Sequence, residues 1–110
     1  MIGYLRGQLL EISTEAALVD VQGVGYEVVC SSHTLEDLQD DLGKEMILWI
    51  HTHVREDALQ LFGFAQKEEK NLFLSLLKVN GVGPKMALTM LSGARPRQIY
   101  QMVESGDAKA

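Results

Sequence analysis

Along the first 64 residues, apolar and polar side chains alternate with a period of two, which is the pattern of β-strands that bury one face. A polar stretch at residues 32–42 interrupts this alternation and has the composition of a helix or a turn. Short strands with one helical insertion in so short a segment favour a small closed β-barrel over an open sheet, and the OB-fold is the natural candidate. The pattern therefore predicts about five strands, at residues 2–12, 17–21, 24–30, 46–54 and from Leu59 onward.

The period changes after Gln66, where apolar residues recur at the spacing of one face of an α-helix. The first helical stripe reaches Gly81, a second follows it, and Pro96 suits the first turn of a third helix. We therefore predict two domains, an OB-fold-like all-β barrel at residues 1–64 and a small all-α helix-hairpin-helix domain at residues 65–110. The residues that define the first two stripes are Leu72, Phe73, Leu76 and Leu77, then Met86, Ala87, Met90 and Leu91.

The connection between the first two predicted helices reads Gly81-Val82-Gly83-Pro84-Lys85. Glycine lets the first helix end at Gly81 through a left-handed residue, since no side chain clashes there. Val82 is expected to fill the space between the two helices, and Gly83 lets a foreign backbone come close. Pro84 fits the first helical position, where its missing N–H costs nothing. The next helix then begins with unpaired amides and with the positive end of its dipole facing outward.

Unpaired amides at the start of a helix attract anions, and Lys85 adds a full positive charge beside them. A phosphate bound there is held by groups that carry no information about base sequence. With apolar residues on both sides, this spacing resembles the helix-hairpin-helix motif, which binds nucleic-acid backbones without sequence preference. A plain connection between two helices of a small bundle is the alternative interpretation of the same residues.

Charge is unevenly distributed along the chain, although the formal net charge is −5. Residues 1–69 contain four basic and thirteen acidic side chains, whereas residues 70–103 contain five basic side chains and no acidic one. An acidic body is therefore joined to a basic segment, and the glycine-rich connection lies inside that segment. This distribution keeps nucleic acid among the candidate partners, which the net charge alone would disfavour.

Four segments, read in order, resemble the RuvA family, whose members are the Holliday-junction-binding subunits of a bacterial branch-migration machine. The resemblance implies an N-terminal OB-like barrel, a helical domain with two helix-hairpin-helix motifs and a flexible link to a small C-terminal domain. This chain stops at Ala110, before the positions where the second motif and the C-terminal domain are expected, which fits either a piece of a longer protein or a naturally short one. The four segments are MIGYLRGQLLE at the start, GVGYEV at residues 23–28, VREDALQLFGF at residues 54–64 and LLKVNGVGPKMALTMLSG at residues 76–93.

The resemblance implies a DNA-binding scaffold without an enzymatic activity of its own. Such a scaffold binds four-way junctions by structure rather than by sequence, as a homotetramer with one tetramer or two on each junction, in recombination and repair. Its implied partners are a hexameric ATPase, RuvB, which drives branch migration, and the junction endonuclease RuvC. No cofactor and no membrane are implied, and the sequence contains no G-x-x-x-x-G-K-S/T string for a nucleotide.

The resemblance also implies roles for particular residues of this chain. Glu56 and Asp57 fall where the family has an acidic pin near the junction centre, and paired carboxylates there would repel converging phosphates. An ordinary charged turn is the alternative, and a magnesium-binding pair is disfavoured because no third ligand is in view. The implied phosphate contacts of the first hairpin are Asn80, Gly81, Val82, Gly83 and Lys85, with Arg55, Lys78 and Arg95 as additional candidate DNA contacts.

One strand face carries three aromatic or imidazole side chains whose role the sequence leaves open. His51 and His53 stand two residues apart without a Cys, Asp or Glu beside them to complete a zinc set, so we expect no metal site. Trp49 shares their face and suits packing, a subunit contact or a base-stacking platform of the kind that OB-folds use.

Two other classes of function compete with a DNA-binding scaffold. A helix-hairpin-helix lyase or glycosylase would use Lys78 or Lys85 as its nucleophile, but it needs a desolvated lysine and a base pocket. A protein-interaction barrel without a DNA role is the other class, and it would lack the steep salt dependence that phosphate contacts produce.

The single cysteine bears on the compartment of the protein. Cys30 cannot form an internal disulfide, and it alternates with Val28 as a small buried residue would. The N-terminus lacks the basic start, apolar centre and cleavage site of a signal peptide. These features predict a protein of a reducing cytoplasm, and the resemblance implies that the cytoplasm is bacterial.

Overall fold

The computed structural model describes residues 1–93 of the chain. The predicted third helix, with Pro96 in its first turn, and the candidate DNA contact Arg95 lie outside the described residues. Among residues 1–93, no helix combines the length and the apolar content needed to cross a bilayer.

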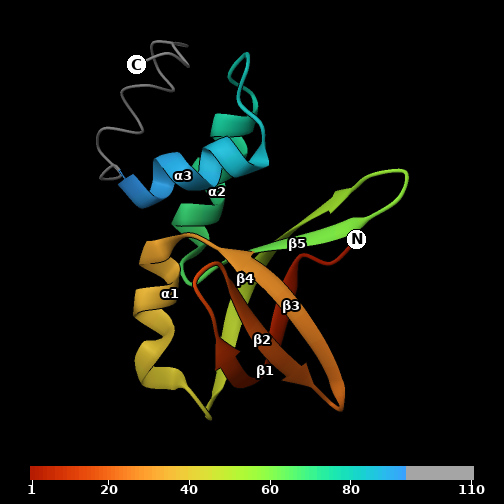
Figure 1. The fold of residues 1–110 in the computed structure, drawn as a ribbon, viewed down its shortest axis with the longest axis vertical. Helices are drawn as coiled ribbons and strands as arrows, with labels where there is room; N and C mark the ends of the chain where they lie inside the picture. The colour runs from red at the N-terminus through yellow and green to blue at the C-terminus, as the bar shows by residue number, and fades with distance from the viewer. Residues whose placement is uncertain (94–110) are drawn as a thin grey trace.

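The N-terminal part is a closed barrel of five strands in the order β1-β2-β3-β5-β4 (Figure 1). Neighbouring strands are antiparallel except for β3 and β5, which pair in parallel. The helix α1 (Ser32–Leu38) and a short 3-10 helix, η1 (Gln39–Asp41), lie between the third and fourth strands, as predicted. The OB-fold-like class is thereby confirmed. The strands are β1 (Tyr4–Ile12), β2 (Ala16–Val21), β3 (Val24–Cys30), β4 (Glu45–Val54) and β5 (Leu59–Phe64).

The barrel interior is filled by the apolar side chains that the period-two pattern singles out. One tight point lies where β3 and β5 meet in parallel, with Cys30 opposite Gly63. A Cβ atom at Gly63 would lie 2.3 Å from Cγ1 of Val28, so a larger residue would force the two strands apart. The residues at the centre of the barrel include Leu9, Ala17, Val19, Val28, Leu48 and Ile50.

The Cys30 thiol is buried, as predicted, and its sulfur donates to the carbonyl of Val28 at 3.5 Å. Burial, with the Glu69 carboxylate as the second cause, raises the pKa of Cys30 from 9.0 to about 12. The folded state therefore holds this proton between pH 9 and 12 while the unfolded chain releases it, so stability should fall as the pH rises through that window.

Urea unfolding at a series of pH values, with Cys30→Ala as the control that lacks the thiol, measures this dependence. We expect the midpoint of the wild-type chain to fall more steeply above pH 9 than that of the control. We also expect iodoacetamide to modify the thiol only as fast as the chain unfolds. Modification of the native chain at the rate of a free thiol would contradict this burial.

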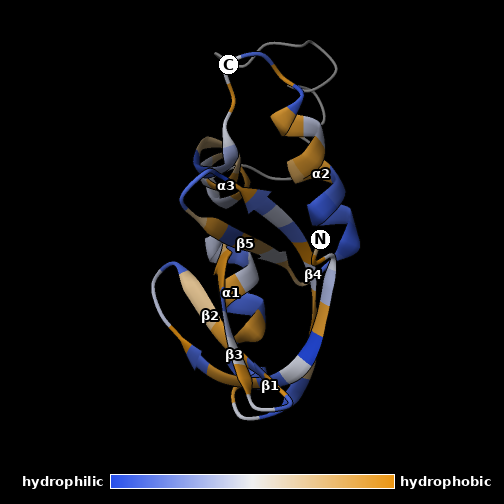
Figure 2. Cartoon of the chain, turned by 90° about the vertical axis from the view of Figure 1, so that its right-hand side faces the viewer, coloured by the Kyte–Doolittle hydropathy of each residue, from blue (hydrophilic) through white to orange (hydrophobic). Residues whose placement is uncertain are grey.

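The helices α2 (Lys67–Leu77) and α3 (Pro84–Gly93) form a hairpin that packs on the outside of the barrel. Figure 2 shows hydrophilic residues on the first turns of α2 and hydrophobic residues on its later part. The contact between hairpin and barrel is a second apolar core, which includes Phe62, Phe64, Leu72, Phe73 and Leu76. The Phe73 ring centroid lies 5.6 Å from that of Phe62 and 5.0 Å from that of Phe64. Apolar packing is therefore continuous from β5 into the helices, across the predicted domain boundary at residues 64 and 65.

The predicted end of the first helix is wrong, because α2 ends at Leu77 and not at Gly81. The amides of Lys78 and Val79 bond three residues back, to Ser75 at 3.1 Å and Leu76 at 3.0 Å, which tightens the last turn and closes the helix. A separate turn follows, in which the Val82 amide donates to the Val79 carbonyl at 3.2 Å. Gly81 is its third residue and has φ +88, the left-handed conformation that the sequence predicts for this glycine.

Candidate nucleic-acid interface

The connection between α2 and α3, which we call the glycine loop (residues 79–83), alternates between buried and exposed residues. Val79 and Val82 are 9% and 7% exposed and hold the loop against the second core, so Val82 fills the space between the helices as expected. Asn80, Gly81 and Gly83 are exposed. Apart from the adjacent residues, no heavy atom of residues 1–93 lies within 4 Å of the position where a side chain would begin on Gly81 or Gly83, so a foreign backbone can approach this loop.

The first amides of α3 have no hydrogen-bond acceptor within the described part of the chain. The helix begins at Pro84, as predicted, and its first bond runs from the Ala87 amide to the Gly83 carbonyl at 2.9 Å. Within residues 1–93, no backbone or side-chain oxygen accepts from the amides of Gly83, Lys85 or Met86. Unpaired amides and the positive end of a helix dipole are the groups that bind anions in other proteins, so this loop is the candidate phosphate site.

Two lysines flank the glycine loop and strengthen its positive potential. Lys78 follows the last residue of α2, Lys85 lies in the first turn of α3, and both are exposed. In the part of the chain that the structure describes, neither forms an ion pair with a carboxylate. Their charges are therefore available to an external anion.

The predicted acidic pin lies at the tip of the β4–β5 hairpin, which projects away from the barrel in Figure 1. This acidic tip (residues 55–58) is closed by a bond of 2.8 Å from the Arg55 amide to the Ala58 carbonyl. The Arg55 Nε donates to Nε2 of His53 at 3.3 Å, which directs the guanidinium back along β4. Glu56 and Asp57 are exposed, and among residues 1–93 no three acidic, histidine or cysteine side chains gather closely enough to hold a metal ion.

The open question about Trp49, His51 and His53 has a structural answer, because their strand face is covered by α2. The Lys67 ammonium lies 5.4 Å above the Trp49 ring, and His51 packs against Phe73 with ring centroids 5.5 Å apart. Burial, followed by the neighbouring charges of His53 and Lys70, lowers the pKa of His51, so this imidazole stays neutral near pH 7. Trp49 and His51 therefore join the barrel to the helical hairpin, whereas His53 lies beside Phe62 of β5, with ring centroids 6.3 Å apart.

Sequence reasoning missed a polar cluster between the barrel and α2. The Glu69 carboxylate accepts hydrogen bonds from the hydroxyls of Ser31 and Thr34, which are almost fully buried. Ser31 is recognisable in the sequence as a helix cap, since its side chain accepts from the Thr34 amide at 3.2 Å. The partner from α2 could not be found that way, because it lies 38 residues further along the chain.

Comparison with known proteins gives matches along the whole chain. The family model described as RuvA N terminal domain matches residues 1–63. A Bdellovibrio bacteriovorus protein named Holliday junction branch migration complex subunit RuvA is 71% identical over 110 residues, which are 100% of this chain and 56% of that protein. Proteins of the same name from Legionella pneumophila and Shewanella halifaxensis are 49% and 47% identical, over 98% and 97% of this chain. The chain spans about half the length of these relatives.

Proposed function

Because this chain belongs to the RuvA N-terminal domain family, we propose that it binds four-way DNA junctions by their structure and not by their sequence. The observation that carries the proposal is the glycine loop, where exposed backbone, uncapped amides and the Lys85 ammonium lie together. Such groups recognise phosphates, which every DNA sequence presents alike. The names of the relatives describe subunits of a Holliday junction branch migration complex, and this supports a branched substrate.

The residues that we propose as phosphate contacts differ in the groups they offer. Gly81 and Gly83 offer bare backbone, and Lys85 offers its ammonium. Asn80 offers an exposed amide side chain, whereas Val82 is buried and its amide donates to the Val79 carbonyl at 3.2 Å, so Val82 contributes by holding the loop in shape. The exposed side chains of Arg55 and Lys78 are proposed as additional contacts.

The one glycine loop within residues 1–93 suggests how copies of the protein assemble on a junction. One glycine loop contacts one duplex arm, so four copies around a fourfold axis would match the four arms of an open junction. We therefore propose that the chain forms a homotetramer, with one or two tetramers on each junction. In the bacterial cytoplasm this tetramer holds the junction for the RuvB motor and for the RuvC nuclease. The exposure of Lys78 and Lys85 supports a role without catalysis, since a lysine nucleophile requires a desolvated site.

The acidic tip is proposed to act at the centre of the junction, where Glu56 and Asp57 repel the converging phosphates and keep the strands apart. Replacing both residues with lysine should change the arm geometry of the bound junction, while its effect on the affinity for linear duplex should be no larger than that of any equal change in net charge. The matched control is Glu36→Lys with Asp37→Lys, because these adjacent carboxylates are also exposed and their replacement changes the net charge equally.

The measurement combines fluorescence anisotropy, which gives both affinities, with energy transfer between dyes on the arms of a synthetic junction. We expect a similar rise in duplex affinity for the two double variants, and a change in arm geometry for the Glu56/Asp57 variant alone. Equal effects of the two variants on the junction would count against a pin.

A further inference from the structure

The polar cluster of Ser31, Thr34 and Glu69 joins two helices of the fold, α1 and α2, at one point. Ser31 caps α1, Thr34 lies in its first turn, and Glu69 lies in the first turn of α2. Ser31 and Thr34 are 1% and 0% exposed, so their hydroxyls have no access to water and need a protein acceptor. Glu69 supplies it, accepting from the Ser31 hydroxyl at 3.2 Å with one carboxylate oxygen and from the Thr34 hydroxyl with the other.

A second polar contact ties the same end of α1 to the other helix of the hairpin. The amide of Ser32 donates to the Ser92 hydroxyl of α3 at 3.0 Å. Both helices of the hairpin are thus bonded to the first turn of α1, which follows directly on barrel strand β3. The rest of the contact between barrel and hairpin is largely apolar and centres on Phe73.

Apolar packing and hydrogen bonds constrain this joint differently. Apolar contacts favour burial without a strong preference for direction, so they allow small rotations of one element on another. Hydrogen bonds to a carboxylate are stronger than those between neutral groups and depend on geometry. The cluster therefore fixes the angle at which the hairpin stands on the barrel.

We propose that Glu69 is a positioning residue for junction recognition, because it holds the glycine loop at a fixed angle to the acidic tip. This inference rests on the proposed function. Linear duplex needs the glycine loop alone, whereas a junction is contacted by the loop and by Arg55 of the tip in the same chain, while Glu56 and Asp57 keep its strands apart. A rigid spacing between two contact sites improves binding only to a partner that engages both.

The test compares Glu69→Ala with Glu68→Ala. Glu68 is the adjacent residue in the first turn of α2, carries the same charge, is exposed and forms no side-chain hydrogen bond or ion pair within residues 1–93. We expect Glu69→Ala to lower the affinity for a four-way junction by about tenfold, and to change the affinity for duplex of the same length by less than about twofold. Glu68→Ala should leave the ratio of the two affinities unchanged.

Trp49 gives a readout that does not depend on DNA, since it is the single tryptophan of the sequence and lies at the contact between barrel and α2. We expect acrylamide to quench its fluorescence more strongly in Glu69→Ala than in Glu68→Ala. Thr34→Val, which removes one donor with little change in shape, should shift both readouts in the same direction. Glu69→Gln, which keeps one strong acceptor, should restore part of the junction affinity.

Two results would overturn the positioning role. Both leave the ratio of junction to duplex affinity unchanged in folded Glu69→Ala and Thr34→Val: in one, the two affinities fall by the same factor, and in the other, neither affinity changes. If the wild-type chain binds neither the junction nor the duplex, the proposed function fails instead. Trp49 quenching then decides whether Glu69 fixes the angle between barrel and hairpin. Unchanged Trp49 quenching in Glu69→Ala would show that Glu69 does not fix this angle.

Discussion

Lys85→Glu should weaken binding to a four-way junction and to linear duplex alike, by about tenfold or more at low salt. Lys85 stands in the first turn of α3, beside the uncapped amides of Gly83 and Met86. Reversing its charge removes an attraction and places a carboxylate where a phosphate should lie. Because the contact is to backbone, the loss should not depend on DNA sequence or on branching.

The dependence of binding on salt gives this prediction a second, quantitative form. Each phosphate contact releases counterions, so losing one should reduce the slope of log affinity against log salt by about one unit for each chain that contacts DNA. Lys44→Glu is the matched control, since Lys44 is exposed in the loop before β4, at the end of the barrel away from α2 and α3 (Figure 1). Full retention of both affinities in Lys85→Glu, or an equal loss in Lys44→Glu, would show that the hairpin does not contact the DNA.

Phe73→Ala should lower the free energy of unfolding by about 3–5 kcal/mol, the range for a large aromatic side chain removed from a core. Phe73 is fully buried, and its ring contacts Phe62, Phe64 and His51, which all belong to barrel strands. The cavity would therefore open at the joint between barrel and hairpin. A loss of this size is a large part of the total stability of a small protein, which is about 5–15 kcal/mol.

Urea unfolding followed by circular dichroism and by Trp49 fluorescence measures this loss. Asn71→Ala is the control, because Asn71 lies two residues earlier on the same helix and is exposed. We expect the control to lie within about 0.5 kcal/mol of the wild-type chain. A loss of less than about 1 kcal/mol in Phe73→Ala would show that the hairpin is held to the barrel by other contacts.

The barrel could be predicted from the sequence because its strands have one buried face. In β4, Met46, Leu48, Ile50 and Thr52 alternate with polar or half-exposed residues, and all four are buried in the structure. The glycine loop could also be predicted, since a left-handed glycine and a proline at the first helical position are local requirements of the backbone.

The joint between barrel and hairpin could not be predicted, since its partners are distant in sequence. The period-two pattern assigns Trp49 and His51 to the outer face of β4, but it does not show that α2 covers that face. The acceptor role of Glu69 depends on bringing α2 against the start of α1, and this contact leaves no periodic signal. The early end of α2 at Leu77 likewise follows from local bonds that apolar spacing does not reveal.

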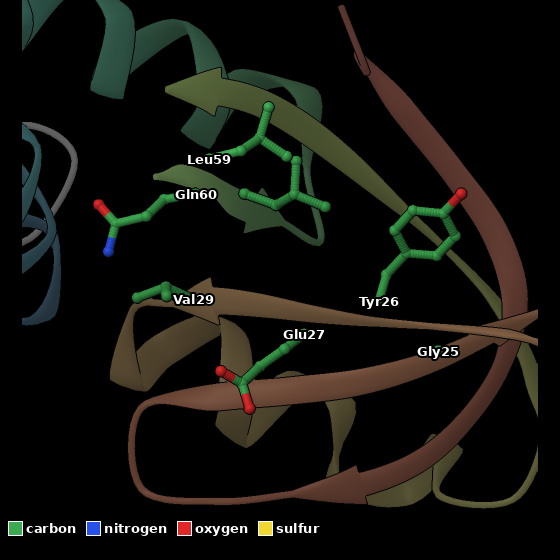
Figure 3. Close-up of a pocket in the computed structure, with 7 residues that line it drawn as sticks. Gly25, Tyr26, Glu27, Val29, Leu59 and Gln60 are labelled. Atoms are coloured by element: carbon green, nitrogen blue, oxygen red, sulfur yellow. The ribbon is translucent and has the colours of Figure 1, made fainter. Parts of the chain in front are cut away.

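A narrow gap between β3 and β5 shows a further limit of pattern-based reasoning. The two strands pair in parallel only over residues 28–30 and 61–63, so their earlier residues diverge. Figure 3 shows the resulting pocket, which is lined by Tyr26 and Glu27 of β3 and by Leu59 and Gln60 of β5. Alternation predicts both strands but not this divergence, because the closure of a barrel is set by all its strands together.

The central claim is that the uncapped amides of the glycine loop and of the first turn of α3 hold DNA phosphates. The most direct test follows the backbone amide resonances of ¹⁵N-labelled chain by NMR during titration with a four-way junction at low and high salt. We predict that the amides of Gly83, Lys85 and Met86 shift most at low salt, and that these shifts shrink as salt is added. Saturating DNA that leaves these three amides unmoved while other residues shift would contradict the claim.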